Sequence, residues 1–192
     1  MNRSHTSATA QRRRKQIEEC LYENLRHSPY QSISVADICR QVGISRKAYY
    51  NYYPDKDSCF SALVDRFIRD ALLQIAEQTP DNANAMAATC VLLEHWKNQR
   101  EFLDIIIRNN LMHILFLRYI NYIQKEEPSL LDLLNHAQVP TDSDILACYT
   151  MSQMTLVLQW YYRGFDTSTE EMAAKYLRII HSPMIPMENQ PQ

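Results

Sequence analysis

The sequence predicts an all-α protein with about nine to ten helices, because apolar residues recur at helical spacing along most of the chain. Only 2 of the 192 residues are glycine, whereas β-sandwiches and barrels need many tight turns. Hydrophobic residues make up 46% of the chain, which is enough for a substantial core. We expect a small N-terminal helical domain followed by a larger helical domain.

The first three helices follow from apolar spacing and from capping residues. A helix at 11–25 would have one apolar face, formed by Ile17, Leu21 and Leu25. Ser34 is placed to cap a second helix, with Asp37 at its third position, and this helix ends before Gly43. Ser45 is placed to cap a third helix, which Pro54 stops.

Gly43 is the most informative residue of this region. It stands between two short helices in a chain that otherwise avoids glycine, which indicates a turn that needs a positive φ. Two helices joined steeply by such a turn form a helix-turn-helix, whose second helix enters the DNA major groove. In that second helix Tyr49 and Tyr53 are predicted to face inward, while Lys47 and Tyr50 face outward.

The rest of the chain is predicted to form a second helical domain. A fourth helix begins at Lys56 and keeps helical period to Ile75, so it leads from the first domain, residues 1–56, into the second, residues 57–192. We expect further helices, by the same periodicity, at about 84–98, 101–110, 112–125, 129–137, 143–163 and 167–181.

The charge is distributed unevenly between these domains. Residues 1–56 contain ten Lys and Arg against five Asp and Glu, whereas the remaining residues contain ten against seventeen. A basic domain joined to an acidic one is typical of a nucleic-acid-facing module attached to a second function. The run Arg12–Lys15 has two interpretations, a solvated helix start or an arm that seeks phosphate or the minor groove.

Several other functions are not supported. No apolar run approaches the ~20 residues that cross a bilayer, and the polar N-terminus does not resemble a signal peptide. We therefore expect a cytoplasmic protein with no membrane partner. The chain has no glycine-rich phosphate loop, no HExxH and no G-x-S-x-G, so we do not expect an enzyme.

The five cysteines predict neither a disulfide framework nor a metal site. They are odd in number, widely spaced and without the Cys/His spacing of a zinc site: Cys20, Cys39, Cys59, Cys90 and Cys148. Buried, reduced thiols are the simplest interpretation, and a redox sensor is the alternative. We predict no metal and no cofactor.

Three stretches carry a family resemblance: 33–38 (ISVADI), 42–45 (VGIS) and 49–56 (YYNYYPDK). Together they resemble the N-terminal domain of TetR/AcrR-type transcriptional regulators. The segment Trp160–Gly164 before the last helix resembles the dimerisation region of that family. The resemblance implies a ligand-responsive, dimeric repressor that binds a pseudo-palindromic operator in double-stranded DNA and is released by a small molecule. The alternative is a helical, DNA-tethered protein–protein adaptor without a small-molecule effector.

The resemblance also implies roles for single residues. Arg46 and Lys47 match base-reading positions, whereas Tyr50, Tyr52 and Lys56 match phosphate-contacting positions. The predicted DNA-binding set is Ser34, Ser45, Arg46, Lys47, Ala48, Tyr50, Asn51, Tyr52 and Lys56. Three positions depart from the family pattern: Ala48 replaces a hydroxyl residue, Tyr53 replaces phenylalanine, and Asp55 replaces a small neutral residue.

The resemblance places a dimer interface and a ligand pocket in the second domain. The predicted interface residues are Met151, Met154, Thr155, Leu158, Gln159, Tyr162, Tyr176, Ile179 and Ile180. The pocket candidates would suit a largely apolar effector: Trp96, Phe102, Ile106, Asn109, Asn110, His113, Phe116, Leu117, Tyr149 and Gln153. For both sets, packing within the domain's own core is the alternative.

Overall fold

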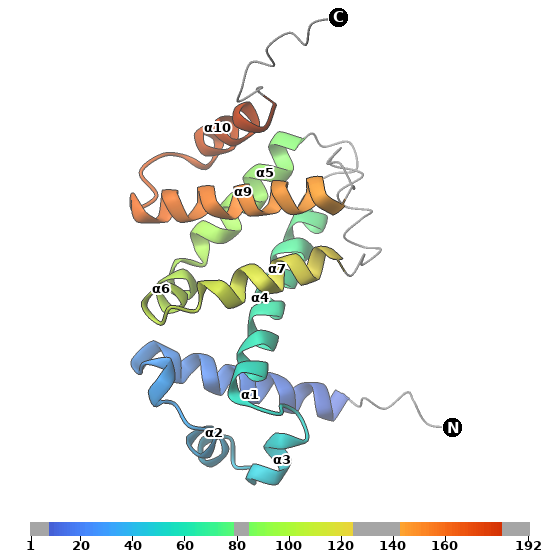
Figure 1. Ribbon diagram of the computed structural model, residues 1–192, viewed down its shortest axis with the longest axis vertical. Coiled ribbons are helices and arrows are strands. Elements are labelled where there is room, and N and C mark those ends of the chain that lie inside the picture. Colours follow the sequence, from blue (N-terminus) through green and yellow to red (C-terminus); the bar gives the residue numbers. More distant parts are fainter. Residues whose placement is uncertain (1–7, 79–84, 125–142, 182–192) are drawn as a thin grey trace, which may run out of the picture. The chain divides into compact units, whose positions relative to one another are not determined.

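The computed structural model describes residues 8–78, 85–124 and 143–181, and every regular element among them is helical (Figure 1). The all-α prediction is therefore confirmed, although the helix expected at 129–137 lies outside the described residues. The chain divides into two compact units. The described residues of 8–67 and 102–118 form one, called here the head unit; those of 68–101 and 119–181 form the other, the body unit.

The head unit contains the first helices of the chain: α1 (Ala8–His27), a 3₁₀ turn η1 (Tyr30–Ser32), α2 (Val35–Val42), α3 (Arg46–Tyr50) and the start of α4 (Lys56–Gln78). The predicted apolar face of α1 is confirmed, because Ile17, Leu21 and Leu25 are fully buried. α1 is longer than predicted. Its added first turn is rich in alanine and borders an arginine run, and both residue types favour helix without needing an apolar face.

The turn between α2 and α3 has the predicted geometry. Gly43 adopts a left-handed conformation with φ of +72°, and the N–H of Ile44 closes the end of α2 by donating to the Cys39 carbonyl at 3.0 Å. Both predicted N-caps are present. The Ser34 hydroxyl accepts from the N–H of Asp37, and the Ser45 hydroxyl accepts from the N–H of Ala48, each at 3.1 Å.

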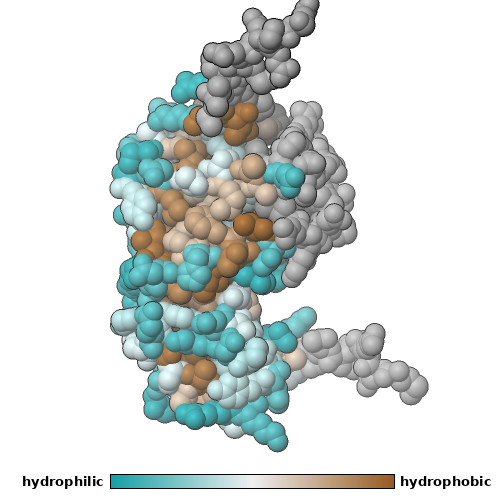
Figure 2. Space-filling view, in the orientation of Figure 1, coloured by the Kyte–Doolittle hydropathy of each residue, from teal (hydrophilic) through white to brown (hydrophobic). Residues whose placement is uncertain are grey.

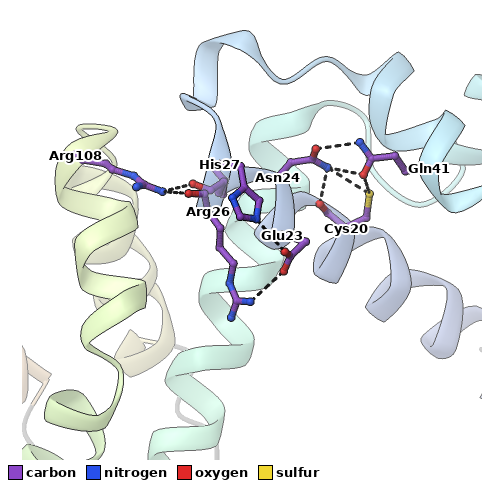
Figure 3. Close-up of polar contacts among 8 residues, drawn as sticks. Cys20, Glu23, Asn24, Arg26, His27, Gln41 and Arg108 are labelled. Carbon is purple, nitrogen blue, oxygen red and sulfur yellow. Dashed lines mark hydrogen bonds and ion pairs between the residues drawn. The ribbon is translucent and has the colours of Figure 1, made fainter.

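A later segment, residues 102–118, also belongs to the head unit. It contains most of α6 (Arg100–Arg108) and the first half of α7 (Met112–Gln124). The Arg108 guanidinium donates to the main-chain carbonyls of Leu25 and Arg26 at the end of α1 (Figure 3). The compact unit thus contains residues 102–118 together with the N-terminal helices. The boundary predicted after Lys56, between a DNA-binding and an effector-binding domain, stays a prediction.

The body unit is organised around α5 (Ala85–Asn98). α10 (Thr169–His181) packs chiefly on α5, and α9 (Ser143–Tyr162) packs on both (Figure 1). Gly164, with φ of +73°, follows the end of α9, and the Ser168 hydroxyl accepts from the N–H of Glu171 in the first turn of α10. The buried centre of this unit includes Leu93, Trp96, Val157, Trp160, Met172 and Tyr176.

The surfaces of the units differ in character. On the face shown in Figure 2, the region of α1 to α3 is largely hydrophilic, whereas many hydrophobic residues reach the surface in the region of α9. No helix among the described residues is both long and apolar enough to span a membrane.

We predict that Gly43→Ala destabilises the head unit by about 1 kcal/mol. No described atom lies within 4 Å of the position that a Cβ would take, so the cost is conformational rather than steric. The left-handed conformation costs an alanine about 1–2 kcal/mol, and only part of this is offset by the lower entropy of the unfolded chain. Urea unfolding should show Gly43→Asn between the wild type and Gly43→Ala. Equal stability of all three would contradict a fixed left-handed turn.

Candidate nucleic-acid interface

Helix α3 presents a charged and polar face to solvent. Arg46, Lys47 and Asn51 are exposed, and 51% of Tyr50 is exposed. Neither Arg46 nor Lys47 has a hydrogen bond or an ion pair with any described residue. Their guanidinium and ammonium groups are therefore available to an external acceptor. Ser45 is also exposed, and Ala48 is half-buried on the same helix.

The opposite face of α3 is anchored by Tyr49. Its ring is fully buried, and its hydroxyl donates to the main-chain carbonyl of Asp55 at 3.2 Å, just before α4 begins. Burial raises the pKa of Tyr49 well above its usual value, so the phenol stays a neutral donor. The ring of Tyr50 meets Tyr49 edge to face, with centroids 5.6 Å apart.

Tyr53 provides a second anchor just after α3. Its ring is buried, and its hydroxyl donates to Glu18 Oε1 on α1 at 2.5 Å. The other Glu18 oxygen lies 3.3 Å from the Arg66 guanidinium on α4. The Arg14 guanidinium lies 5.6 Å from the centroid of the Tyr53 ring. Nothing in the sequence pattern indicates that Glu18 is the partner of the Tyr53 hydroxyl, or that Arg66 pairs with Glu18.

Asp55, which departs from the family pattern, has a structural role. Its carboxylate accepts from the N–H of Ser58 at 2.6 Å, so it caps the start of α4. The side-chain and main-chain hydrogen bonds from Ser58 lower the pKa of Asp55 below its usual range. The negative charge therefore also complements the positive end of the α4 dipole.

The predicted phosphate contacts differ in accessibility. Ser34 is exposed at the start of α2, where its hydroxyl also donates to the Asp37 carboxylate at 2.5 Å. Tyr52 is half-buried after α3. Lys56 is half-buried too, and its ammonium lies 2.5 Å from the Tyr30 carbonyl and 2.8 Å from the Ile33 carbonyl. Two of its three donors are therefore engaged within the head unit.

Some of the basic residues in the run Arg12–Lys15 already have partners within the head unit. Arg12 is exposed and has no described partner, whereas Lys15 lies 3.7 Å from Glu19 one turn later. Both members of that pair are more than half exposed, so the pair contributes little to stability. Arg14 is positioned by the ring of Tyr53. Both interpretations of the run, solvated helix start and DNA arm, stay open.

Comparison with known sequences finds partial relatives. No protein-family model matches the chain. A relative named nucleoid occlusion factor SlmA, from Shewanella frigidimarina, is 35% identical over 83 residues, which are 43% of this chain and 42% of the relative. A second relative of the same name, from Shewanella denitrificans, is 35% identical over 81 residues, 42% of this chain and 41% of the relative. The chain therefore spans less than half the length of the curated relatives it matches.

Comparison with solved structures covers nearly the whole chain. A chain described as a TetR-family transcriptional regulator from Syntrophomonas wolfei matches with a TM-score of 0.61 at 15% identity, covering 93% of this chain and 100% of that one. The fatty acid degradation regulator FadR from Bacillus halodurans matches with a TM-score of 0.56 at 12% identity, covering 90% and 96%. This chain has the fold of the TetR-family transcriptional regulators.

The TetR-type fold confirms the architecture that the resemblance implied. The names of these relatives describe regulators and a nucleoid occlusion factor, in agreement with the prediction that the chain is not an enzyme. The described residues contain no group of three His, Cys, Asp or Glu side chains that could hold a metal ion.

The predicted ligand residues are divided between the two units. Trp96 and Gln153 are buried in the body unit, and the side chain of Tyr149 lies outside the described part of the chain. The others belong to the head unit: Phe102, Ile106, Asn109, Asn110, His113, Phe116 and Leu117. A ligand pocket formed by residues of both units stays a prediction.

Phe102 and Asn109 make structural contacts within the head unit, and Asn110 has a positive φ. Phe102 stacks on Phe67 with centroids 3.7 Å apart, and the Asn109 side-chain oxygen accepts from the main-chain N–H of Tyr30 at 2.7 Å. Asn110 has φ of +57° after the end of α6, a conformation that asparagine tolerates better than most residues. His113 and Leu117, by contrast, are exposed on α7.

The predicted dimer residues separate into inward and outward groups. Met154 and Tyr176 are buried within the body unit itself. Tyr162 is 65% exposed and Ile179 is 45% exposed, so each leaves apolar surface uncovered. Thr155 and Gln159 are also exposed, while Met151, Leu158 and Ile180 are half-buried. The interface itself stays a prediction.

Burial raises the thiol pKa of most of the cysteines. Cys39 and Cys59 are buried, and burial raises the pKa of the Cys59 thiol to about 12. Burial also raises the pKa of the half-buried Cys20, whose thiol points to Gln41 Oε1 at 3.3 Å beside the paired amides of Asn24 and Gln41 (Figure 3). High thiol pKa values disfavour the reactive thiolate. Cys148 is exposed.

We predict that Tyr53→Phe lowers the free energy of unfolding by about 1–2 kcal/mol, because the Glu18 carboxylate loses its phenolic donor in a buried setting. The matched control is Tyr50→Phe, since the exposed Tyr50 hydroxyl has no hydrogen-bond partner among the described residues. This control should change stability by less than about 0.5 kcal/mol. Urea unfolding of the three proteins provides the comparison; equal losses in both variants would rule out a special role for the Tyr53–Glu18 bond.

Proposed function

We propose that this chain is a DNA-binding transcriptional regulator of the TetR type that represses its target as a homodimer in the cytoplasm. The observation that supports the proposal is the two-sided character of α3. Tyr49 and Tyr53 fix the helix and the residues after it from inside, while Arg46 and Lys47 stay exposed and unpaired among the described residues. Cations without an internal partner, on a rigidly anchored helix, suit a polyanion such as DNA.

Within this proposal, some residues of the head contact base edges and others contact phosphates. Arg46 and Lys47 donate to guanine O6 and N7 in the major groove, and Ala48 leaves room for a thymine methyl group. Ser34, Tyr50 and Tyr52 contact phosphate oxygens and set the register of the head on the duplex. Ser45 and Asn51, exposed at the two ends of α3, complete the proposed surface.

Dimerisation follows from the small size of the reading helix. A five-residue helix reaches only a few base pairs, so a specific site needs two heads about 34–36 Å apart on a pseudo-palindromic operator. The exposed apolar residues of α9 and α10 are the proposed contact, through Tyr162 and Ile179 in particular. Met154 and Tyr176 then support that surface from within the body unit.

Two forms of control are proposed for the dimer. In the first, a largely apolar small molecule binds the DNA-incompetent state more tightly and so releases the operator. In the second, the chain is a DNA-tethered adaptor that binds another protein and no small molecule. One observation favours the second form: two predicted ligand residues already have partners within the head unit, because Phe102 stacks on Phe67 and Asn109 bonds to Tyr30.

We expect Arg46→Ala and Lys47→Ala each to cost about 1–3 kcal/mol of binding to a duplex selected from a random library, with reduced preference over a scrambled duplex. The reason is that each variant removes a donor to a base edge. Gel-shift titration at fixed salt measures both quantities. Arg69→Ala, which removes an exposed cation from the body unit, is the matched control and should leave both unchanged. Full affinity and selectivity in both α3 variants would refute the proposed reading helix.

We expect Ile179→Glu to convert the dimer into monomers and to weaken operator binding, because a charge would be buried at the proposed contact. Leu73→Glu is the matched control, since Leu73 is a similarly exposed apolar residue, 51% exposed, outside the predicted interface. Sedimentation equilibrium should show a dimer for the control and a monomer for the Ile179 variant. A dimer in both cases would place the interface elsewhere.

A further inference from the structure

Lys56, the first residue of α4, turns its ammonium group into the protein. Its Nζ lies 2.5 Å from the carbonyl oxygen of Tyr30 and 2.8 Å from that of Ile33. It also lies 4.0 Å from the centroid of the Tyr30 ring. Burial lowers the pKa of this lysine below its usual value. A side chain expected to face DNA is thus bound to the turn that precedes α2.

Tyr30 is held from several directions at once. Its hydroxyl donates to the Asp57 carboxylate, and its ring meets Phe60 with centroids 5.5 Å apart. Its main-chain N–H donates to the Asn109 side chain at 2.7 Å. Together with Lys56, these contacts engage the ring, the hydroxyl and both main-chain polar groups of one residue. The position of Tyr30 is therefore defined by its neighbours and not by its own turn alone.

The two carbonyls that Lys56 holds belong to one tight turn. The N–H of Ile33 donates to the Tyr30 carbonyl at 3.2 Å, and Ile33 directly precedes Ser34, the N-cap of α2. A lysine that fixes both carbonyls therefore fixes the point at which α2 begins. Ser34 in turn is a proposed phosphate contact at that end of α2.

We propose that Lys56 is a positioning residue of the DNA-binding head: it holds the Tyr30–Ile33 turn, and with it the start of α2, and does not contact a phosphate itself. Two charge-assisted hydrogen bonds to carbonyls and the contact with the Tyr30 ring hold the ammonium at this turn. This inference rests on the proposed DNA binding. It differs from that proposal in assigning Lys56 to the interior.

Salt dependence of binding separates the two roles of a lysine. The slope of log K against log salt concentration is negative, and each phosphate contact that a variant removes makes it shallower by about 0.9. We expect Lys56→Met, which keeps the stem against Tyr30, to weaken binding of the selected duplex about tenfold at every salt concentration with an unchanged slope. Lys47→Met is the matched control for loss of a base contact: its lysine is exposed with no described partner, and the variant should lose preference for the selected over the scrambled duplex, whereas Lys56→Met should keep that preference.

Hydrogen exchange of the free protein tests the same inference without DNA. Lys56→Met should speed amide exchange in residues 28–38 and leave α9 unchanged, and Lys56→Arg, which can still donate to both carbonyls, should restore slow exchange and tight binding. Tyr30→Phe removes only the bond to Asp57 and alters no charge, so it should also speed exchange in 28–38 at an unchanged slope.

The outcomes are distinct. A slope made shallower by about 0.9 per head in Lys56→Met, with normal exchange, would make Lys56 a phosphate contact and overturn the inference. Unchanged affinity and exchange would overturn it as well. If Lys56→Met does not fold, Tyr30→Phe decides: faster exchange in 28–38 supports the inference, and unchanged exchange overturns it. If the wild type binds no DNA, the proposed function fails, while the exchange experiment still tests the role of Lys56.

Discussion

A helix of five residues cannot hold its own shape in water, because it is far shorter than the ~12–15 residues at which isolated helices become marginal. Helix α3 therefore depends on what its buried face contacts. Tyr49 is fully buried, and Tyr53 is buried just beyond the end of the helix, so each contributes on the order of 1.5–3 kcal/mol of apolar burial. This leaves the other face free to carry unpaired charge. The same anchoring fixes the direction in which Arg46 and Lys47 point.

The anchors are connected by polar contacts to other helices of the head unit. Tyr53 reaches Glu18 on α1, and Glu18 reaches Arg66 on α4. A buried carboxylate with both oxygens engaged is costly to disturb, because removing one partner leaves a charge without compensation. The orientation of α3 is thus tied to two longer helices. Such a network favours one arrangement of the head over its alternatives, which is what a fixed docking geometry requires.

Residues 102–118 add further polar contacts to the N-terminal helices of the head unit. Arg108 donates to main-chain carbonyls at the end of α1 (Figure 3). The Asn109 side chain accepts from the main-chain N–H of Tyr30, and Arg118 makes an ion pair with Asp65. These contacts bring a segment distant in the sequence into the unit that carries α3. Any event that shifts this segment would act on Tyr30, and through it on the start of α2.

The sequence by itself determined the helices, the turn at Gly43 and the caps at Ser34 and Ser45, because these depend on local spacing and on single-residue backbone preferences. It also indicated the inward and outward faces of α3. Tertiary structure alone decided the partner of Tyr53, the inward turn of Lys56 and the membership of residues 102–118 in the head unit. Each of these depends on contacts between residues far apart in the chain, and such contacts leave no periodic pattern in the sequence.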